Sequence, residues 1–344
     1  MAEAALARDL ASRLLARDRS AVAPALNLVD DRRPDRRAEA LALLARVERA
    51  DAVPRAHDAL RVGVTGAPGA GKSTLLDALV RALRARGATV GVIAVDPSSQ
   101  RTGGALLGDR FRMRASARDE GVFVRSMAAR ERLGGLADAT WASVIVLASV
   151  FDWVFVETVG VGQSEGDVAR QVDTTVFVAQ PGAGDLLQFM KAGVLELPDV
   201  FVVNKADTGA AAARTQRELR AGLALGERKT AGWEPPVLLA SARDGAGVEE
   251  VLDAVRAHRA ALEASGELAR LRARARVAHV REALARRFGS HGIERLGGPD
   301  ALDARAAARV AEGGSAFELL GELAAGLEAA LAPPGAQREA GDAT

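Results

Sequence analysis

Short apolar runs alternate with amphipathic stretches through the middle of the chain. Runs rich in Val, Ile and Phe predict β-strands at residues 61–65, 89–96, 121–126, 152–158, 174–180, 200–204 and 236–241. Several of these runs are apolar on both faces, which is typical of central strands in a parallel sheet covered by helices. Because helical stretches separate the strands and crossovers are right-handed, the pattern predicts a doubly wound α/β domain with a mostly parallel sheet over residues 58–264.

The residues before this domain predict a helical extension, residues 1–57. Apolar residues recur at helical spacing on both sides of the charged turn "DDRRPDRR", namely Leu6, Leu10 and Leu14 before it and Leu41, Leu44 and Val47 after it. The first twenty residues carry charges throughout and lack the uninterrupted apolar core of a signal peptide. We therefore interpret this segment as an amphipathic helix.

The residues after the α/β domain predict two further helices over 265–333 and a disordered tail over 334–344. The apolar positions of the first, Arg-rich run are Leu268, Leu271, Ala275, Ala278 and Ala285, and those of the second are Phe317, Leu320, Leu323 and Leu327. The arginines of the first run are interpreted as a solvated face. The two helices together either dock on the sheet domain or form a dimer interface, and the sequence leaves both alternatives open.

Composition narrows the class of protein. The chain has 344 residues, a formal net charge of +1 and no Cys. The near-zero charge indicates no global field toward nucleic acid or membrane, and no apolar run is long enough to span a bilayer. Without Cys, disulfides, thiolate metal sites and a Cys nucleophile are excluded, and a cytoplasmic location is the default expectation.

The few lysines are informative because the chain uses Arg almost everywhere else. Of 46 basic residues only four are Lys, namely Lys72, Lys191, Lys205 and Lys229. A lysine retained in such a sequence indicates a position that needs a compact ammonium group rather than a guanidinium. Chance retention is the preferred interpretation for Lys229.

A phosphate-binding loop follows the first predicted strand and opens a helix. Residues 66–73, "GAPGAGKS", match G-x-x-x-x-G-K-[ST] without a gap. Its glycines allow backbone N–H groups to surround the β- and γ-phosphates at a positive helix N-terminus. Lys72 is the expected point charge on these phosphates and a catalytic residue, and the Ser73 hydroxyl is an expected Mg²⁺ ligand. The expected nucleotide contacts of this loop are Gly66, Ala67, Pro68, Gly69, Ala70, Gly71, Lys72, Ser73 and Thr74.

A carboxylate stands at the end of the strand at 152–158. Glu157 precedes "TVGVGQSE", and ligands gather at the carboxyl ends of strands in open α/β sheets. A carboxylate there can hold Mg²⁺ and its water shell, as the Walker-B Asp does. Glu157 and Gly160 then form E-x-x-G, similar to the D-x-x-G of GTPases, with the Gly160 N–H on the γ-phosphate. Taken alone, the stretch also fits an ordinary exit from a strand to a loop.

The residue that positions the attacking water is less defined. Val161 follows Gly160 at the place where Ras-like GTPases have a water-orienting Gln, and Gln163 lies two positions further on. Intrinsic hydrolysis is therefore expected to be slow. Asp96 and Asp109 are candidates for the metal shell or for the attacking water, and a loop cap is the alternative interpretation for each.

A guanine-recognition motif follows the strand at 200–204. Asn204, Lys205 and Asp207 form N-K-x-D, and the Asp carboxylate can accept from guanine N1–H and the exocyclic amine together, which adenine does not offer. The Lys205 stem would pack along the base. The backbone N–H groups of a later stretch are expected at guanine O6, and its residues are Ser241, Ala242 and Arg243. The order of the three motifs at successive strand ends favours GTP and GDP over ATP.

With these motifs in place, the chain closely resembles the MeaB family of G3E-type GTPases, which includes the methylmalonic aciduria type A protein and proteins once labelled ArgK or LAO/AO transport ATPases. The stretches that carry the resemblance cover most of residues 60–260 and include "GVTGAPGAGKSTL", "VIAVDPSSQRTGGALLGDRFRM", "ETVGVGQSEGDVARQVD" and "VFVVNKAD". The resemblance implies a Mg²⁺-dependent homodimeric GTPase with N-terminal helices and a C-terminal dimerisation arm over 265–333.

The resemblance also implies the biological role and further site residues. Such proteins are chaperones of an adenosylcobalamin-dependent acyl-CoA mutase, most often methylmalonyl-CoA mutase, and they gate cofactor loading and protect the enzyme. In the family pattern Asp96 and Asp109 belong to switch I near Mg²⁺ and Glu157 to switch II. Residues 182–197 correspond to a further switch that faces the mutase.

The last of these segments departs from the family pattern. The family usually reads close to "GDELQGIKKGI", whereas this chain has "GDLLQFMKAGV" with Leu186, Phe189 and Met190. A more apolar partner surface and a more tightly packed helix are equal alternatives. The residues expected to form the partner switch are Asp185, Gln188 and Lys191.

Two other functions compete with the chaperone. A metal-insertion GTPase of nickel enzymes needs Cys or His clusters, but the chain has no Cys and its four His are scattered. A transport-associated kinase would phosphorylate a binding protein, but no stretch is typical of a dock for one, and N-K-x-D argues against ATP.

Overall fold

The computed structural model describes residues 2–31, 33–51, 58–97, 119–129, 133–158, 168–182, 198–224 and 232–331. These residues contain a seven-stranded sheet with the order β3-β2-β4-β1-β5-β6-β7, and every pairing is parallel. The strands are β1 (Leu60–Thr65), β2 (Val90–Pro97), β3 (Val122–Ala129), β4 (Trp153–Glu157), β5 (Thr174–Ala179), β6 (Val200–Val203) and β7 (Val237–Leu239). Each predicted strand overlaps one of them, so the predicted fold class is confirmed.

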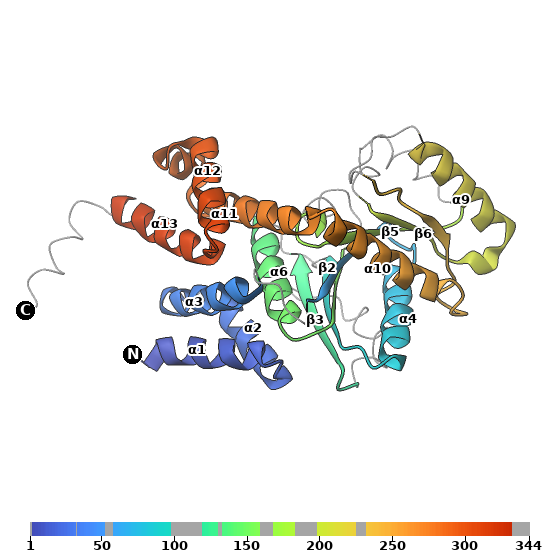
Figure 1. Cartoon of the computed structure of the whole chain (residues 1–344), viewed down its shortest axis with the longest axis horizontal. Coiled ribbons are helices and arrows are strands. Elements are labelled where there is room, and N and C mark those ends of the chain that lie inside the picture. Colours follow the sequence, from blue (N-terminus) through green and yellow to red (C-terminus); the bar gives the residue numbers. More distant parts are fainter. Residues whose placement is uncertain are drawn as a thin grey trace, which may run out of the picture.

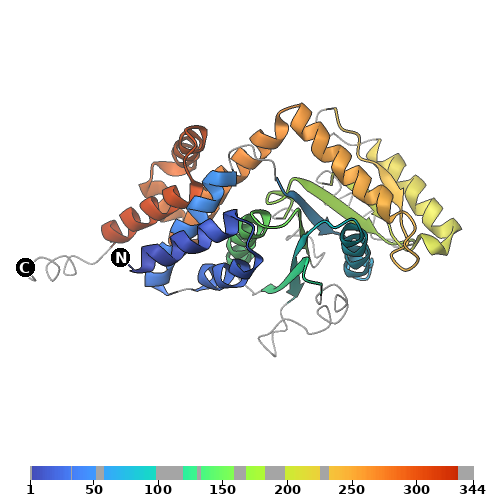
Figure 2. The same ribbon diagram turned by 60° about the horizontal axis from the view of Figure 1, so that its bottom comes forward.

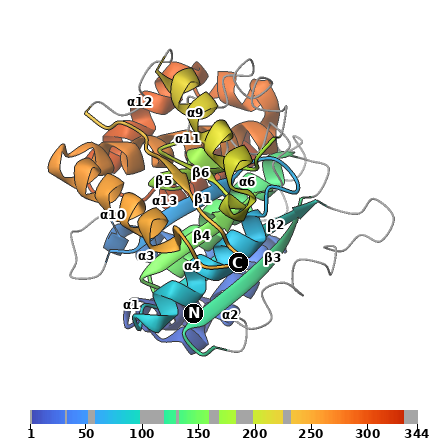
Figure 3. The same ribbon diagram turned by 90° about the vertical axis from the view of Figure 1, so that its right-hand side faces the viewer.

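Helices cover both faces of the sheet (Figures 1 and 3). They are α4 (Lys72–Ala85) and α10 (Val248–Ala264) on one face, and α6 (Leu133–Ala148) and α9 (Ala210–Leu223) on the other. Successive strand residues point to opposite faces. In β4, Trp153 and Phe155 join the core under α4 and α10, while Val154 and Val156 join the core under α6. All five residues of β4 are buried, and the strand is apolar up to Glu157 because helices cover both of its faces.

The two flanks of the chain form one layer of helices beside the sheet domain, at the left in Figure 1 and again in Figure 2. The N-terminal helices are α1 (Ala2–Leu15), α2 (Val22–Asp30) and α3 (Pro34–Asp51), and the C-terminal ones are α11 (Glu267–Arg295), α12 (Gly298–Ala311) and α13 (Ala316–Leu331). Helix α13 packs on α3, α11 and α12. Its apolar face, including Leu320, Leu323 and Leu327, is therefore covered by helices of the same chain rather than by the sheet.

The buried face of α11 differs from the predicted one. Leu268 is buried as expected, but Ala285 is exposed, and the buried side of the helix also contains Arg272, Arg276 and His279. The interpretation of the arginine run as a solvated face is wrong for Arg272 and Arg276. The spacing of apolar residues did not predict this face, because Arg272 and Arg276 are buried through pairing with the buried carboxylates of Asp173 and Glu48.

An ion-pair cluster at the amino end of the sheet joins α10 and α11 to the strands. Asp173, directly before β5, accepts from Arg272 at 2.9 and 2.7 Å and from Arg259 at 3.0 Å. Both arginines also bind Asp58, two residues before β1. Burial alone would raise the pKa of Asp173, but Arg272, Arg61 and Arg259 hold it below its ordinary value. The cluster lies at the end of the sheet opposite to the glycine-rich loop.

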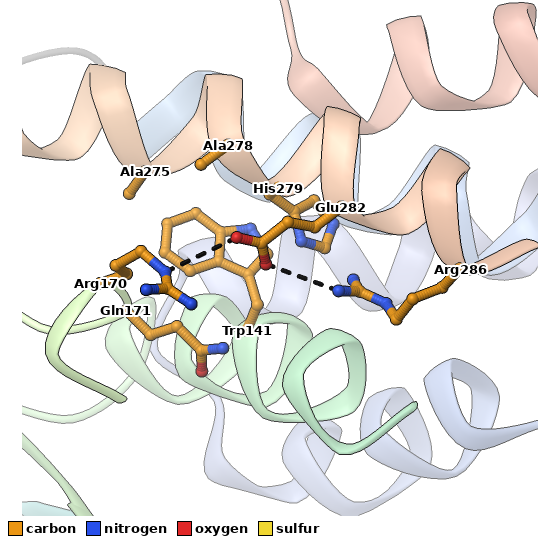
Figure 4. Close-up of a pocket in the computed structure, with 8 residues that line it drawn as sticks. All are labelled: Trp141, Arg170, Gln171, Ala275, Ala278, His279, Glu282 and Arg286. Atoms are coloured by element: carbon orange, nitrogen blue, oxygen red, sulfur yellow. Dashed lines mark hydrogen bonds and ion pairs between the residues drawn. The ribbon is translucent and has the colours of Figure 1, made fainter. Parts of the chain in front are cut away.

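A second contact joins α11 to α6 and to the residues that precede β5 (Figure 4). The Trp141 ring of α6 stacks on His279 with centroids 5.7 Å apart, and Arg170 lies 3.6 Å from the Glu282 carboxylate. His279 also makes an edge contact with Phe317 in α13, with ring centroids 5.2 Å apart. Through these contacts the helical layer is fixed to the sheet domain by aromatic packing as well as by charge.

We predict that Asp173→Asn destabilises the protein by about 3–5 kcal/mol, because it removes the buried one of the two carboxylates that Arg259 and Arg272 share. The stabilisation from Asp173 is present above its unfolded-state pKa of about 4 and is lost as the pH falls through its lower native pKa. Urea unfolding from pH 7 to 3 should therefore show a smaller acid-dependent loss in the variant than in the wild type.

The matched control for this prediction is Asp253→Asn, which removes a carboxylate from an exposed pair with Arg256. That change should alter the unfolding free energy by less than about 1 kcal/mol. Equal effects of the two substitutions would contradict the assigned importance of the buried cluster.

Candidate nucleotide-binding site

The glycine-rich loop connects β1 to α4 at the carboxyl edge of the sheet. Gly66 and Gly71 have φ values of 135° and 87°, in the region that side chains disfavour. A Cβ on Gly66 would lie 2.1 Å from the Val178 carbonyl oxygen, and one on Gly71 would lie 2.5 Å from Nδ2 of Asn204. Both positions therefore need glycine for conformation and for space. Of the remaining predicted contacts, Pro68, Gly69 and Thr74 are exposed, and Ala67 and Ala70 are buried.

The Lys72 ammonium group is held inside this loop. Its Nζ donates to the carbonyl oxygens of Gly66 at 2.8 Å and Ala67 at 3.1 Å, and the side chain is only 7% exposed. A compact ammonium fits within a turn of this size, whereas a planar guanidinium needs a wider space. The small space around the Nζ explains why this Arg-rich chain has Lys at position 72.

Ser73 and Glu157 meet across the sheet although they are 84 residues apart. The Ser73 hydroxyl donates to Oε1 of Glu157 at 2.6 Å, and both side chains are buried. Strand pairing explains the contact, because Glu157 in β4 is in register with Val64 of β1, shortly before the loop. A hydroxyl and a carboxylate together are the hard oxygen ligands that Mg²⁺ prefers.

Several other predicted residues are placed only in part or not at all. Asp96 lies near the end of β2, two residues beyond Ala94, the register partner of Glu157. That backbone position is on the same edge of the sheet. The predicted residues Asp109, Gly160, Gln163, Asp185, Gln188 and Lys191 lie outside the described residues.

Asn204 connects the loops of the site. Its Nδ2 donates to the carbonyl oxygens of Ala70 at 3.0 Å and Gly71 at 3.3 Å, and its Oδ1 accepts from the Ala242 N–H at 3.2 Å. The side chain is 2% exposed. Asn204 therefore joins the phosphate loop to the two segments predicted to contact the base.

Lys205 adopts a left-handed backbone conformation that is uncommon for residues other than glycine, with φ 59° and ψ 41°. Its Nζ donates to the Gly69 carbonyl at 2.8 Å and to Oε1 of Gln180 at 2.9 Å. Gln180 was not among the predicted site residues. Gln180 could have been predicted as a site residue, because it directly follows β5 at the same edge of the sheet as the other loops.

Asp207 lies in a short 3₁₀ turn, Ala206–Thr208, beside the segment that begins at Ser241. Its Oδ1 accepts from the Ser241 hydroxyl at 3.1 Å, and Arg243 lies 3.4 Å from its Oδ2. Ser241 and Ala242 are buried, whereas Arg243 is exposed. The structure thus brings the predicted phosphate and base residues together at one edge of the sheet.

No group of three or more His, Cys, Asp or Glu side chains within the described residues is arranged to hold a metal ion. Among the helices that the structure describes, none has the length and apolar character needed to cross a membrane.

The parallel sheet, the loop between β1 and α4, and the N-K-x-D segment after β6 define the P-loop GTPase class. The family model described as "Methylmalonyl Co-A mutase-associated GTPase MeaB" matches residues 22–292. The chain belongs to this family.

Named relatives and a solved structure agree with this assignment. The chain is 42% identical to "GTPase ArgK" of Escherichia coli over 81% of this chain and 84% of the relative. It is 38% identical to "Methylmalonic aciduria type A homolog, mitochondrial" of Mus musculus over 73% of this chain and 62% of the relative. A crystal structure titled "LAO/AO transport system kinase" is 32% identical, with a TM-score of 0.67, and covers 85% of this chain and 89% of its own.

We predict that Lys72→Ala lowers GTP turnover at least about 100-fold and greatly weakens nucleotide binding, because it removes the ammonium from the phosphate loop. Steady-state phosphate release and calorimetry with GDP measure the two effects. Arg214→Ala, on the exposed side of α9, is the control and should retain both. Near-normal turnover by Lys72→Ala would refute the phosphate-site assignment.

We predict that Asp207→Asn relaxes the preference for guanine, because the amide donates where the carboxylate accepts. The ratio of GTP to XTP affinity should fall at least about tenfold, as expected for the loss of a charged hydrogen-bond acceptor. Competition binding with both nucleotides measures this ratio. An unchanged ratio would count against the base site.

Proposed function

We propose that this chain binds and hydrolyses GTP, and that it acts as a cytoplasmic chaperone that gates adenosylcobalamin loading and protects an adenosylcobalamin-dependent acyl-CoA mutase. The observation that carries the nucleotide part is the double link made by Asn204, from the phosphate loop at Ala70 to the base segment at Ala242. Family membership supports the mutase part.

In this proposal each loop takes one part of the nucleotide. Lys72 and the backbone of residues 66–74 bind the β- and γ-phosphates, joined by the Gly160 N–H. Asp207 accepts from the guanine N1–H and exocyclic amine, and the Lys205 stem packs along the base. The backbone N–H groups of Ser241, Ala242 and Arg243 meet guanine O6.

The proposal also includes Mg²⁺, which would neutralise charge that develops on the phosphate oxygens. Ser73 and Glu157 fit this ion because their oxygens lie together, buried, beside the phosphate loop. Asp96 and Asp109 are proposed as further members of its shell. For these two residues and Gln163 we also propose a role in orienting the attacking water, since Val161 cannot do so.

The proposed partner contacts lie on two parts of the chain. Asp185, Gln188 and Lys191 are proposed to face the mutase. A homodimer through residues 265–333 would use the outer sides of α11, α12 and α13, because the apolar side of α13 is covered within the chain.

We predict that adding the cognate mutase raises GTP turnover, because the partner completes a site whose own water-orienting group is weak. The expected increase is at least about tenfold, within the range of general acid–base and positioning effects. Phosphate release is measured with purified candidate mutases, with Lys72→Ala as the control for contaminating GTPases. A rate that is indifferent to every candidate mutase would remove the chaperone role and leave the GTPase intact.

A further inference from the structure

The carboxylate of Asp207 has partners within its own protein for both oxygens. Its Oδ1 accepts from Ser241 at 3.1 Å, and its Oδ2 lies 3.4 Å from a terminal nitrogen of Arg243. The proposed function requires the same two oxygens for the N1–H and the exocyclic amine of guanine. Guanine and the Arg243 side chain are therefore directed at the same acceptor.

The chemical match between these two donors is close. A guanidinium presents planar N–H donors that suit a carboxylate. The edge of guanine that carries N1 and the exocyclic amine is itself a guanidine fragment with the same donor pattern. The Arg243 guanidinium thus pairs with Asp207 through the same kind of donor group that guanine would present to it.

Arg243 lies in a cluster with three other side chains, Asp207, Ser241 and Asp244. Its Nε donates to Oδ1 of Asp244 at 3.0 Å, and the single proton of the Ser241 hydroxyl serves either Oδ2 of Asp244 or Oδ1 of Asp207, each at 3.1 Å. The hydrogen bond from Arg243 is the main cause that lowers the pKa of Asp244, so this carboxylate is ionised at neutral pH. Because the Arg243 side chain is 75% exposed, its contact with Asp207 is weak and readily exchanged.

A groove beside this cluster offers Arg243 a second position. It has a volume of about 260 Å³ and is lined by Arg243 and Asp244 together with Ala78 of α4 and Glu249 of α10. Asp244 lines this groove and also accepts from the Arg243 Nε. The guanidinium can therefore leave Asp207 while it keeps a carboxylate partner, which lowers the barrier to the exchange.

We infer that Arg243 is an internal competitor of guanine, which holds the Asp207 carboxylate through the donor pattern of the base and slows nucleotide association until it moves into the groove. This inference rests on the proposed function of the base site. It assigns to the Arg243 side chain a role in association kinetics that is separate from the backbone contact proposed for the same residue.

The test is the association rate of a ribose-labelled fluorescent GDP, measured by stopped flow at low and high salt. Arg243→Met keeps most of the side-chain length and the backbone N–H but removes the competing donors. Its association rate is expected to be about two- to fivefold above wild type at low salt, as fits the loss of a weak exposed pair. The difference should shrink at high salt, where screening weakens the pair in the wild type.

Arg217→Ala removes an exposed arginine from α9 and is the matched control variant, which should leave the association rate unchanged.

The possible outcomes separate the inference from the proposed function. If Arg243 served only to attract the anionic nucleotide, Arg243→Met would slow association, and this sign would overturn the inference. An unchanged rate in Arg243→Met would overturn it as well, with guanine binding intact. Failure of the wild type to bind the labelled GDP would instead reject the proposed function.

Discussion

The site depends on one buried amide. Asn204 donates to the phosphate loop 134 residues earlier in the chain and accepts from the segment at Ala242, 38 residues later. These bonds set the distance between the loop that suits phosphates and the loops that suit a base. A site that binds both the base and the phosphates of one nucleotide needs loops held at a defined separation. Because buried polar groups without partners are costly, Asn204 also stabilises the arrangement that it defines.

The rest of the fold supports this edge from the other end of the strands. The functional loops among the described residues lie at the carboxyl ends of the strands, and the buried Asp173 cluster holds the long helix α11 at the amino ends. The helical layer is attached there and through Trp141 and His279, away from the nucleotide edge. Because the helical layer is attached at the amino ends, its described helices do not cover the loops near Ser73, Glu157 and Asp207.

The sequence predicted most of the sheet and its loops for a simple reason. Strands such as 200–204 are apolar on both faces, and only a helix-covered parallel sheet buries such strands. The phosphate loop and N-K-x-D could be predicted because they are contiguous. Ser73 and Glu157 were both assigned to Mg²⁺, because Ser73 belongs to the phosphate-loop motif and Glu157 ends a strand at the same edge of the sheet. Helix α12 was missed, because it is dominated by Ala and has no strong apolar stripe.

Long-range pairing explains what the sequence could not predict. The burial of Arg272 and Arg276 depends on carboxylates such as Asp173 and Glu48, which are distant in the chain. The linking role of Asn204 and the contact of Lys205 with Gln180 depend on how three loops fold against one another. These interactions have no local pattern, so only the three-dimensional arrangement reveals them.

Calorimetry measures directly whether the loops joined by Asn204 bind a guanine nucleotide. Titration of the purified chain with GDP and with ADP, each in the presence of Mg²⁺, compares the two bases against the same phosphate loop. The account predicts saturable binding of GDP at one site per chain and at least about tenfold weaker binding of ADP. Equal affinity for the two nucleotides, or no uptake of either, would contradict it.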